Sequence, residues 1–239
     1  MIILAVDTSS SVAAVAVSGG DRLLGEYMLD HGKTHSQKLV PMISELMKAL
    51  ELLPCDIDVY AASSGPGSFT GLRIGITTIK AMAYAVHKPV VSVPTLDSLA
   101  YNIQSSGNTL VCPIMDARNS QVYTALYKAE GGIQTNITGY MGIPVEELVR
   151  VILGKNRDVV FNGDAVQLHR DFLKRELGDR CAFASVSLQR QRASSVAQLA
   201  FLKASGGELE DCFGMVPFYL RKSQAEREYE RKYEQSRNS

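Results

Sequence analysis

A glycine-rich segment, Ser64–Arg73, constrains the fold of this 239-residue chain more than any other stretch of its sequence. Gly65 and Gly67 allow backbone angles and close approaches that a side chain would forbid, and Pro66 stiffens the turn between them. An apolar run precedes the segment and an apolar helical pattern follows it, with Thr70 as the expected N-cap. The sequence predicts a strand, a tight loop and a helix N-terminus that suits an anion. A turn whose glycines serve packing alone fits the same pattern.

Composition narrows the classes of function. The 25 basic and 25 acidic residues cancel, which argues against a broad basic surface that grips RNA or DNA by itself. The four cysteines stand far apart in the sequence, so we expect reduced, mostly buried thiols of a cytoplasmic protein and no zinc site. The apolar N-terminus stops at Asp7, which suits a buried strand and no signal peptide, and no run is long enough for a membrane span.

The first 93 residues alternate between strand and helix patterns. Strands are expected at 2–7, 12–18 and 23–29, followed by a helix that begins near His35 and ends before Pro54. A strand at 59–63, a helix at 70–87 and a strand at 89–93 complete this part. This order is the pattern of one lobe of the actin/hexokinase-type nucleotide-binding fold.

A second set of elements begins near Thr95. Helices are expected from residue 95 and at 144–153, 168–177 and 194–204, with strands at 110–115, 121–127 and 159–162 and an extended stretch at 215–220. We therefore expect a two-lobed α/β protein in which each lobe is a mixed sheet flanked by helices. Residues 1–102 form the N-terminal lobe with the glycine loop, and residues 103–239 form the C-terminal lobe with a polar tail.

Several segments of the chain resemble one family in order and spacing. The segment Ser64–Arg73 looks like the hallmark of the TsaB (YeaZ) family. The other matching segments are Leu4–Ser9, similar to the family's first strand, His35–Met42, similar to its first helix, Pro113–Arg118 with Val122 and Tyr123, similar to its second-lobe hairpin, and Pro217–Arg221, similar to its C-terminal strand.

The resemblance implies a role in tRNA modification. Members of this family pair with TsaD, the related transferase that completes N6-threonylcarbamoyladenosine at position 37 of tRNAs reading ANN codons. The resemblance implies a non-catalytic scaffold of TsaD, with the small ATPase TsaE as a further partner and tRNA bound through the complex. It also implies that ATP and Mg²⁺ are used by the complex and that this chain has no cofactor of its own.

The positions of the transferase's metal ligands differ in this chain. The catalytic relative carries a His-x-x-x-His pair after the strand that follows its glycine-loop helix, and the matching positions here are Thr95 and Leu99. Leucine cannot ligate a metal and a lone threonine hydroxyl is a poor ligand, so no metal site is expected. His31 and His35 have i, i+4 spacing, but Gly32 lies between them and Thr34 suits the N-cap of the helix that follows. His35 is therefore expected in the first turn of that helix, making local hydrogen bonds.

A vestigial nucleotide site remains a hypothesis. In actin-like kinases an early aspartate and a hydroxyl turn face the phosphates and Mg²⁺. The candidate cofactor-binding residues here are Asp7, Thr8, Gly65, Pro66, Gly67 and Ser68. Asp7 equally suits an Asx turn that closes the first hairpin. From the second lobe only Asp116 and the turn at 162–164 are candidates, and neither lies in a Gly-rich phosphate signature.

The two predicted helices of the first lobe carry the expected partner surface. The first has more apolar residues than one face against its own sheet requires, and small residues on the second allow close helix approach. Either these residues are all core, or they pack against the equivalent helices of TsaD and drive homodimers in its absence. The candidates are Leu39, Met42, Ile43, Leu46, Met47, Gly71, Arg73, Gly75 and Thr78.

Two further functions are open alternatives. A small-molecule kinase or phosphotransferase of the same fold predicts Mg-ATP binding by the isolated chain. A peptidase has less support, because the sequence shows no zinc motif and its four histidines, His31, His35, His87 and His169, fall in no catalytic context.

Overall fold

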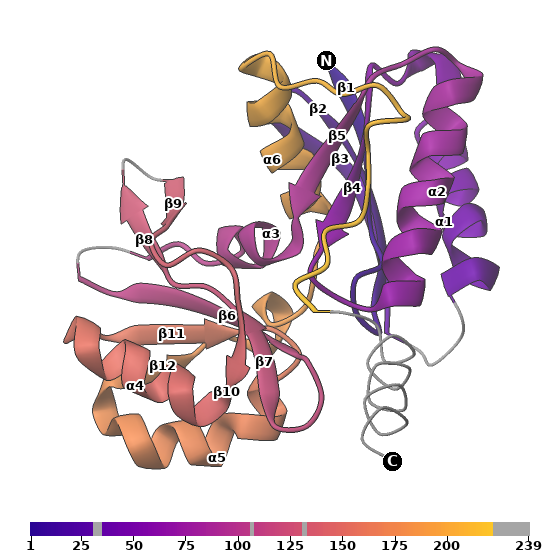
Figure 1. Ribbon diagram of the computed structural model, residues 1–239. Coiled ribbons are helices and arrows are strands. Elements are labelled where there is room, and N and C mark those ends of the chain that lie inside the picture. The colour runs from indigo at the N-terminus through magenta and orange to yellow at the C-terminus, as the bar shows by residue number, and fades with distance from the viewer. Residues whose placement is uncertain (31–34, 106–107, 131–132, 222–239) are drawn as a thin grey trace, which may run out of the picture.

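The computed structural model describes residues 1–30, 35–105, 108–130 and 133–221, and these form two lobes, each built on one sheet (Figure 1). The first sheet has the order β3-β2-β1-β4-β5. Its strands are β1 (Ile2–Asp7), β2 (Ala13–Gly19), β3 (Arg22–Leu29), β4 (Val59–Gly65) and β5 (Val90–Pro94). The first three strands are antiparallel, and β4 and β5 run parallel to β1.

Helices cover both faces of the first sheet. On one face lie α1 (His35–Ala49) and α2 (Phe69–Ala85), whose apolar side chains pack with Val6, Val15 and Tyr60. On the other face α6 (Ala193–Ser205) packs Val196, Ala197 and Ala200 on the sheet. Because both faces are covered, β1 and β4 are buried along nearly their whole length and mostly apolar, with the polar residues Asp7, Ser63 and Ser64 at their carboxyl ends.

The second sheet repeats this design, with the order β10-β7-β6-β11-β12, while β8 pairs with β6 and β9 pairs with β8. The strands are β6 (Leu110–Asp116), β7 (Gln121–Thr124), β8 (Tyr127–Glu130), β9 (Ile133–Asn136), β10 (Met141–Pro144), β11 (Val159–Asn162) and β12 (Cys181–Phe183). The helices α4 (Val145–Lys155) and α5 (Val166–Leu177) cover one face. The predicted two-lobed α/β class, with a mixed sheet flanked by helices in each lobe, is confirmed.

Parts of the chain that follow residue 102 belong to the first lobe. Helix α3 (Thr95–Tyr101) lies between the lobes and packs on the second sheet through Leu96 and Leu99. Helix α6 then returns to the first sheet, where Glu26 of β3 accepts hydrogen bonds from the backbone N and Oγ of Ser194 at 2.9 and 2.8 Å. The segment 210–221, here called the C-terminal strap, follows α6 along β5 and α2 (Figure 1). The expectation that residues 103–239 all belong to the second lobe is therefore wrong for α6 and for most of the strap.

Most predicted elements are confirmed within a few residues, and the differences have local causes. The N-cap of α2 is Ser68, whose Oγ accepts from Gly71 N at 3.2 Å, so the prediction of Thr70 is wrong by two residues. The prediction lacks the short strands β8, β9, β10 and β12, which have no continuous apolar run like the one that reveals the equally short β11. His31, Gly32, Thr34 and the polar tail after Arg221 lie outside the described residues.

No helix of the described segments is long and apolar enough to cross a membrane.

Candidate functional site

The glycine loop lies where β4 ends and α2 begins. Its peptide bond between Gly65 and Pro66 is cis. The C-terminal strap closes one side, because Phe218 N donates to the carbonyl oxygen of Ser64 at 2.7 Å. Gly65 has a φ of 119°, and a Cβ there would collide with the Phe218 carbonyl oxygen, so this position requires glycine.

The chain's own turn after β1 fills the inside of the loop. Ser68 N donates to the carbonyl oxygen of Ser9 at 2.7 Å, and Thr8 Oγ1 donates to the carbonyl oxygen of Gly71, also at 2.7 Å. A Cβ on Gly67 would collide with the Ser9 carbonyl oxygen, and one on Gly71 with that of Thr8. Gly67 and Gly71 therefore serve packing, because the space beside each of them is occupied by backbone.

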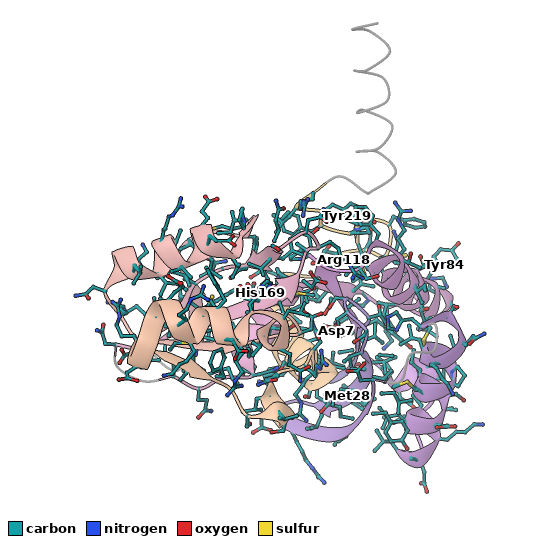
Figure 2. All side chains as sticks on the ribbon, turned by 90° about the horizontal axis from the view of Figure 1, so that it is seen from below. Asp7, Met28, Tyr84, Arg118, His169 and Tyr219 are labelled. Atoms are coloured by element: carbon teal, nitrogen blue, oxygen red, sulfur yellow. The ribbon has the colours of Figure 1, made fainter. Side chains whose placement is uncertain are left out.

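Asp7 is fully buried beneath this turn, and Figure 2 labels it in the interior of the molecule. Its Oδ1 accepts from the backbone N and Oγ of Ser9 at 2.9 and 2.6 Å, and its Oδ2 accepts from Ser63 Oγ. This is the Asx turn that the sequence allows. Burial raises the pKa of Asp7, while the hydrogen bonds from Ser63 and Ser9 oppose that shift.

A polar cleft of about 650 Å³ separates the glycine loop from the second lobe. Of the six predicted cofactor-binding residues, the cleft is lined by Gly67 and Ser68, whereas Asp7, Thr8, Gly65 and Pro66 are not on its wall. The opposite wall carries Asp116 and Asp164, and Asp116 N donates to Asp164 Oδ1 at 3.1 Å. Burial raises the pKa of Asp164. The cleft therefore presents hydroxyls on one side and, on the other, two carboxyl groups together with Arg118, whose Nη1 lies 3.6 Å from Asp116 Oδ2.

The two positions that match the transferase's metal-binding histidines are core positions. Thr95 and Leu99 both have 0% exposure, and Leu99 packs in the cluster between α3 and the second sheet. No group of three or more His, Cys, Asp or Glu side chains among the described residues is arranged to hold a metal ion. His35 lies in the first turn of α1, where its Nε2 donates to the carbonyl oxygen of Ser10 at 2.8 Å, a partner distant in sequence.

The predicted apolar partner residues of α1 are buried within the chain itself. Each has an exposure of 5% or less and packs in the core between α1, α2 and the first sheet: Leu39, Met42, Ile43, Leu46 and Met47. The expectation that they form an exposed patch is wrong, because the neighbouring α2 covers the part of α1 that the sheet does not.

The small residues of α2 also face inward. A Cβ on Gly75 would meet Thr8 Oγ1, so Gly71 and Gly75 allow α2 to approach the turn after β1 and are not free for a partner helix. Thr78 and Arg73 differ from them. Thr78 lines a groove beside α1 while its Oγ1 donates to Ile74 O at 2.8 Å, and Arg73 is exposed, with its Nε donating to Tyr219 Oη at 3.0 Å.

An open apolar groove of about 610 Å³ lies on the outer surface between α1 and α2. We call it the α1–α2 groove. Its exposed lining includes Val40, which is 55% exposed, together with Thr77 and Ala81. The partner residues predicted from the sequence do not include these three. Val40 lies beside the buried positions of α1 in the helical pattern, so its exposure depends on where α2 packs.

Comparison with known proteins gives consistent results for sequence and structure. A family model described as "TsaD: tRNA N6-adenosine threonylcarbamoyltransferase" matches residues 30–229. The Bacillus subtilis protein "tRNA threonylcarbamoyladenosine biosynthesis protein TsaB" is 32% identical over 226 residues, which cover 95% of this chain and 96% of the relative.

Solved structures agree with this assignment. The structure titled "YeaZ from Pseudomonas aeruginosa" matches with a TM-score of 0.77 and 27% identity, over 92% of this chain and 99% of the other. Component A of the (R)-2-hydroxyglutaryl-CoA dehydratase of Acidaminococcus fermentans, at 12% identity and a TM-score of 0.52, covers 86% of this chain and 99% of its own and shares the fold. The actin/hexokinase-like fold expected from the element order is thus confirmed, and the chain belongs to the TsaB (YeaZ) family of tRNA threonylcarbamoyladenosine biosynthesis proteins.

Proposed function

We propose that this chain is a non-catalytic scaffold that holds a TsaD-type transferase in its working state during formation of N6-threonylcarbamoyladenosine on tRNA. The family places the chain in this pathway. In the proposal the transferase binds the α1–α2 groove, TsaE joins the assembly, and tRNA contacts the complex. The chain supplies no cofactor, and ATP and Mg²⁺ are used by the complex in the cytoplasm.

The open α1–α2 groove is the observation that carries the proposal. It is apolar, it lies on the lobe that carries the family's hallmark segment, and its floor is made by the buried side chains Ile43 and Met47. Thr77 and Ala81 form a low ridge on its α2 side, which a partner helix can approach closely. The burial of Thr95 and Leu99 adds support, because neither residue presents a metal ligand to a substrate.

The experiment measures complex formation between this chain and its transferase by size exclusion with light scattering. The variant Val40→Glu places a charge in the groove at a position that is already 55% exposed, so the fold should tolerate it. We expect the native chain to form a complex and Val40→Glu to bind at least about tenfold more weakly. Leu46→Glu is unsuitable, because Leu46 is buried and an ionised group there would unfold the lobe.

The matched control is Val186→Glu, which adds the same charge at a 79% exposed valine of the second lobe. It should bind as well as the native chain. If both glutamate variants bound equally well, the interface would lie elsewhere. If the native chain formed no complex, the scaffold proposal would fail. A homodimer of the native chain that dissociates on adding transferase would show that the groove serves both contacts.

The kinase alternative is tested on the isolated chain. It requires Mg-ATP in the polar cleft, near Ser68 and Asp116. Our account expects no heat of binding at millimolar ATP in calorimetry. A saturable signal that Asp116→Asn abolished would favour the kinase.

A further inference from the structure

A second apolar groove, of about 520 Å³, lies on the other side of α2, between that helix and the C-terminal strap. We call it the α2–strap groove. The strap is held in place there by Lys80, whose Nζ donates to the carbonyl oxygens of Met215 at 2.9 Å and Phe213 at 3.4 Å. Farther along, Tyr219 stacks on Phe69 with ring centroids 4.2 Å apart. One wall of the groove is therefore the strap, which these contacts hold against α2.

Large apolar side chains are exposed along this groove. Phe213 is 72% exposed, Val216 63% and Tyr84 59%. The rings of Tyr84 and Phe213 meet edge to face at 5.8 Å, and Tyr84 stands at the edge of the molecule in Figure 2. Aromatic side chains that stand exposed together on a pocket wall are typical of the residues that dominate binding energy at protein interfaces.

The charged side chains that line the groove are all basic. Arg73 and Lys80 line it, and no acidic side chain of the described chain does. Among those residues Arg73 hydrogen-bonds only the Tyr219 hydroxyl and Lys80 only backbone carbonyls, so neither cation pairs with a carboxylate of the described segments. The complementary ligand is a segment with apolar anchors and adjacent carboxylates.

The α2–strap groove is continuous with the α1–α2 groove. Thr77 and Ala81 line both, so the two grooves meet along the exposed ridge of α2. A partner seated on α1 and α2 is thereby brought against the strap as well. We propose that the transferase partner of this chain inserts an acidic, apolar segment into the α2–strap groove, which makes Phe213 and Val216 anchor points of the complex. This assignment rests on the proposed function.

The test compares transferase affinities by calorimetry and salt dependence by stopped flow. The double variant Phe213→Ser/Val216→Ser removes the exposed anchors and should weaken binding at least about tenfold. Val186→Ser is the matched control and should leave the affinity unchanged. Association of the native chain should slow as salt rises, and Arg73→Gln should flatten that dependence while Arg73→Lys, which keeps the charge, should not. Equal melting temperatures would show that the variants are folded.

The outcomes separate this inference from the proposed function. If the native chain bound and Val40→Glu did not, but the double variant bound normally, the α2–strap assignment would be overturned and the scaffold would stand. If the double variant changed only self-association of this chain, the groove would belong to a second copy and the assignment would again be wrong. If the native chain formed no complex with the transferase, both the scaffold proposal and the α2–strap assignment would be wrong.

Discussion

The glycine loop and the α1–α2 groove belong to the same lobe, and they differ in what fills them. The loop, whose sequence is distinctive, is packed against the backbone of Thr8 and Ser9 and against the strap. The groove, whose sequence is ordinary, is open to solvent. A motif that cradles a ligand in one protein can hold together the fold of another, so the distinctive sequence of the loop does not by itself identify a ligand.

The largest change in the free energy of unfolding is expected for a substitution on the buried face of α1, compared with one on its exposed face. Leu46→Ala removes a side chain that is 2% exposed and should lower the free energy of unfolding by about 2–5 kcal/mol. Val40→Ala, on the groove side of the same helix, should change it by less than about 0.5 kcal/mol. Urea unfolding followed by circular dichroism measures both. Equal losses would mean that Val40 is covered in the free chain.

The variant Gly71→Ala tests whether the backbone of the turn after β1 packs tightly against the glycine loop. The added Cβ would press on the Thr8 carbonyl oxygen, which is backbone and cannot turn aside. We expect a loss of about 1–3 kcal/mol in the free energy of unfolding.

Gly154→Ala in α4 is the matched helical control, since nothing lies within 4 Å of its new Cβ. It should gain up to about 1 kcal/mol from helix propensity. If Gly71→Ala left the free energy of unfolding unchanged in the same urea titration, the loop would not be packed tightly against Thr8.

The buried carboxyl beneath the loop gives a pH dependence. Burial raises the pKa of folded Asp7 above its ordinary value of 3.8. The folded state then holds the proton to higher pH than the unfolded state, so stability falls as pH rises from 3.8 through the folded pKa. The pKa values of Asp97 and Asp164 are raised by burial too and act in the same direction.

Asp7→Asn removes the contribution of Asp7 to that slope. The variant should lose less stability than the native chain between pH 4 and pH 7, as measured by urea midpoints across that range. Asp171→Asn, which changes an exposed carboxyl on α5, should keep the native slope. An unchanged slope in Asp7→Asn would contradict the account of this site.

The smallest effect is expected where the strap covers the loop. Tyr219→Phe keeps the stacking on Phe69 and loses only the hydroxyl that accepts from Arg73 Nε, a pair that is exposed. Its unfolding free energy should fall by about 0.5 kcal/mol. Tyr219→Ala loses the stack as well and should fall by about 1 kcal/mol more in the same titration. No difference between the two would mean that the strap does not hold the loop.

The sequence predicted the order of the strands and helices well, because long apolar runs such as β1 and helical spacing such as that of α1 survive in any fold. It did not predict that α6 returns to the first sheet, since that depends on Glu26 meeting Ser194 across the fold. It could not separate Leu46 from Val40 as core and surface without knowing that α2 covers one side of α1. The exposed anchors of the strap, such as Phe213, lie in irregular backbone and carry no periodic signal.

The central claim is that this chain acts by holding its transferase through the α1–α2 groove, and multiple-turnover modification of tRNA tests it most directly. Purified transferase, threonylcarbamoyl-AMP and tRNA should yield little N6-threonylcarbamoyladenosine alone and many turnovers once the native chain is added. Val40→Glu should restore activity only at much higher concentration, and Val186→Glu should match the native chain. A transferase that turned over many times without this chain would contradict the account.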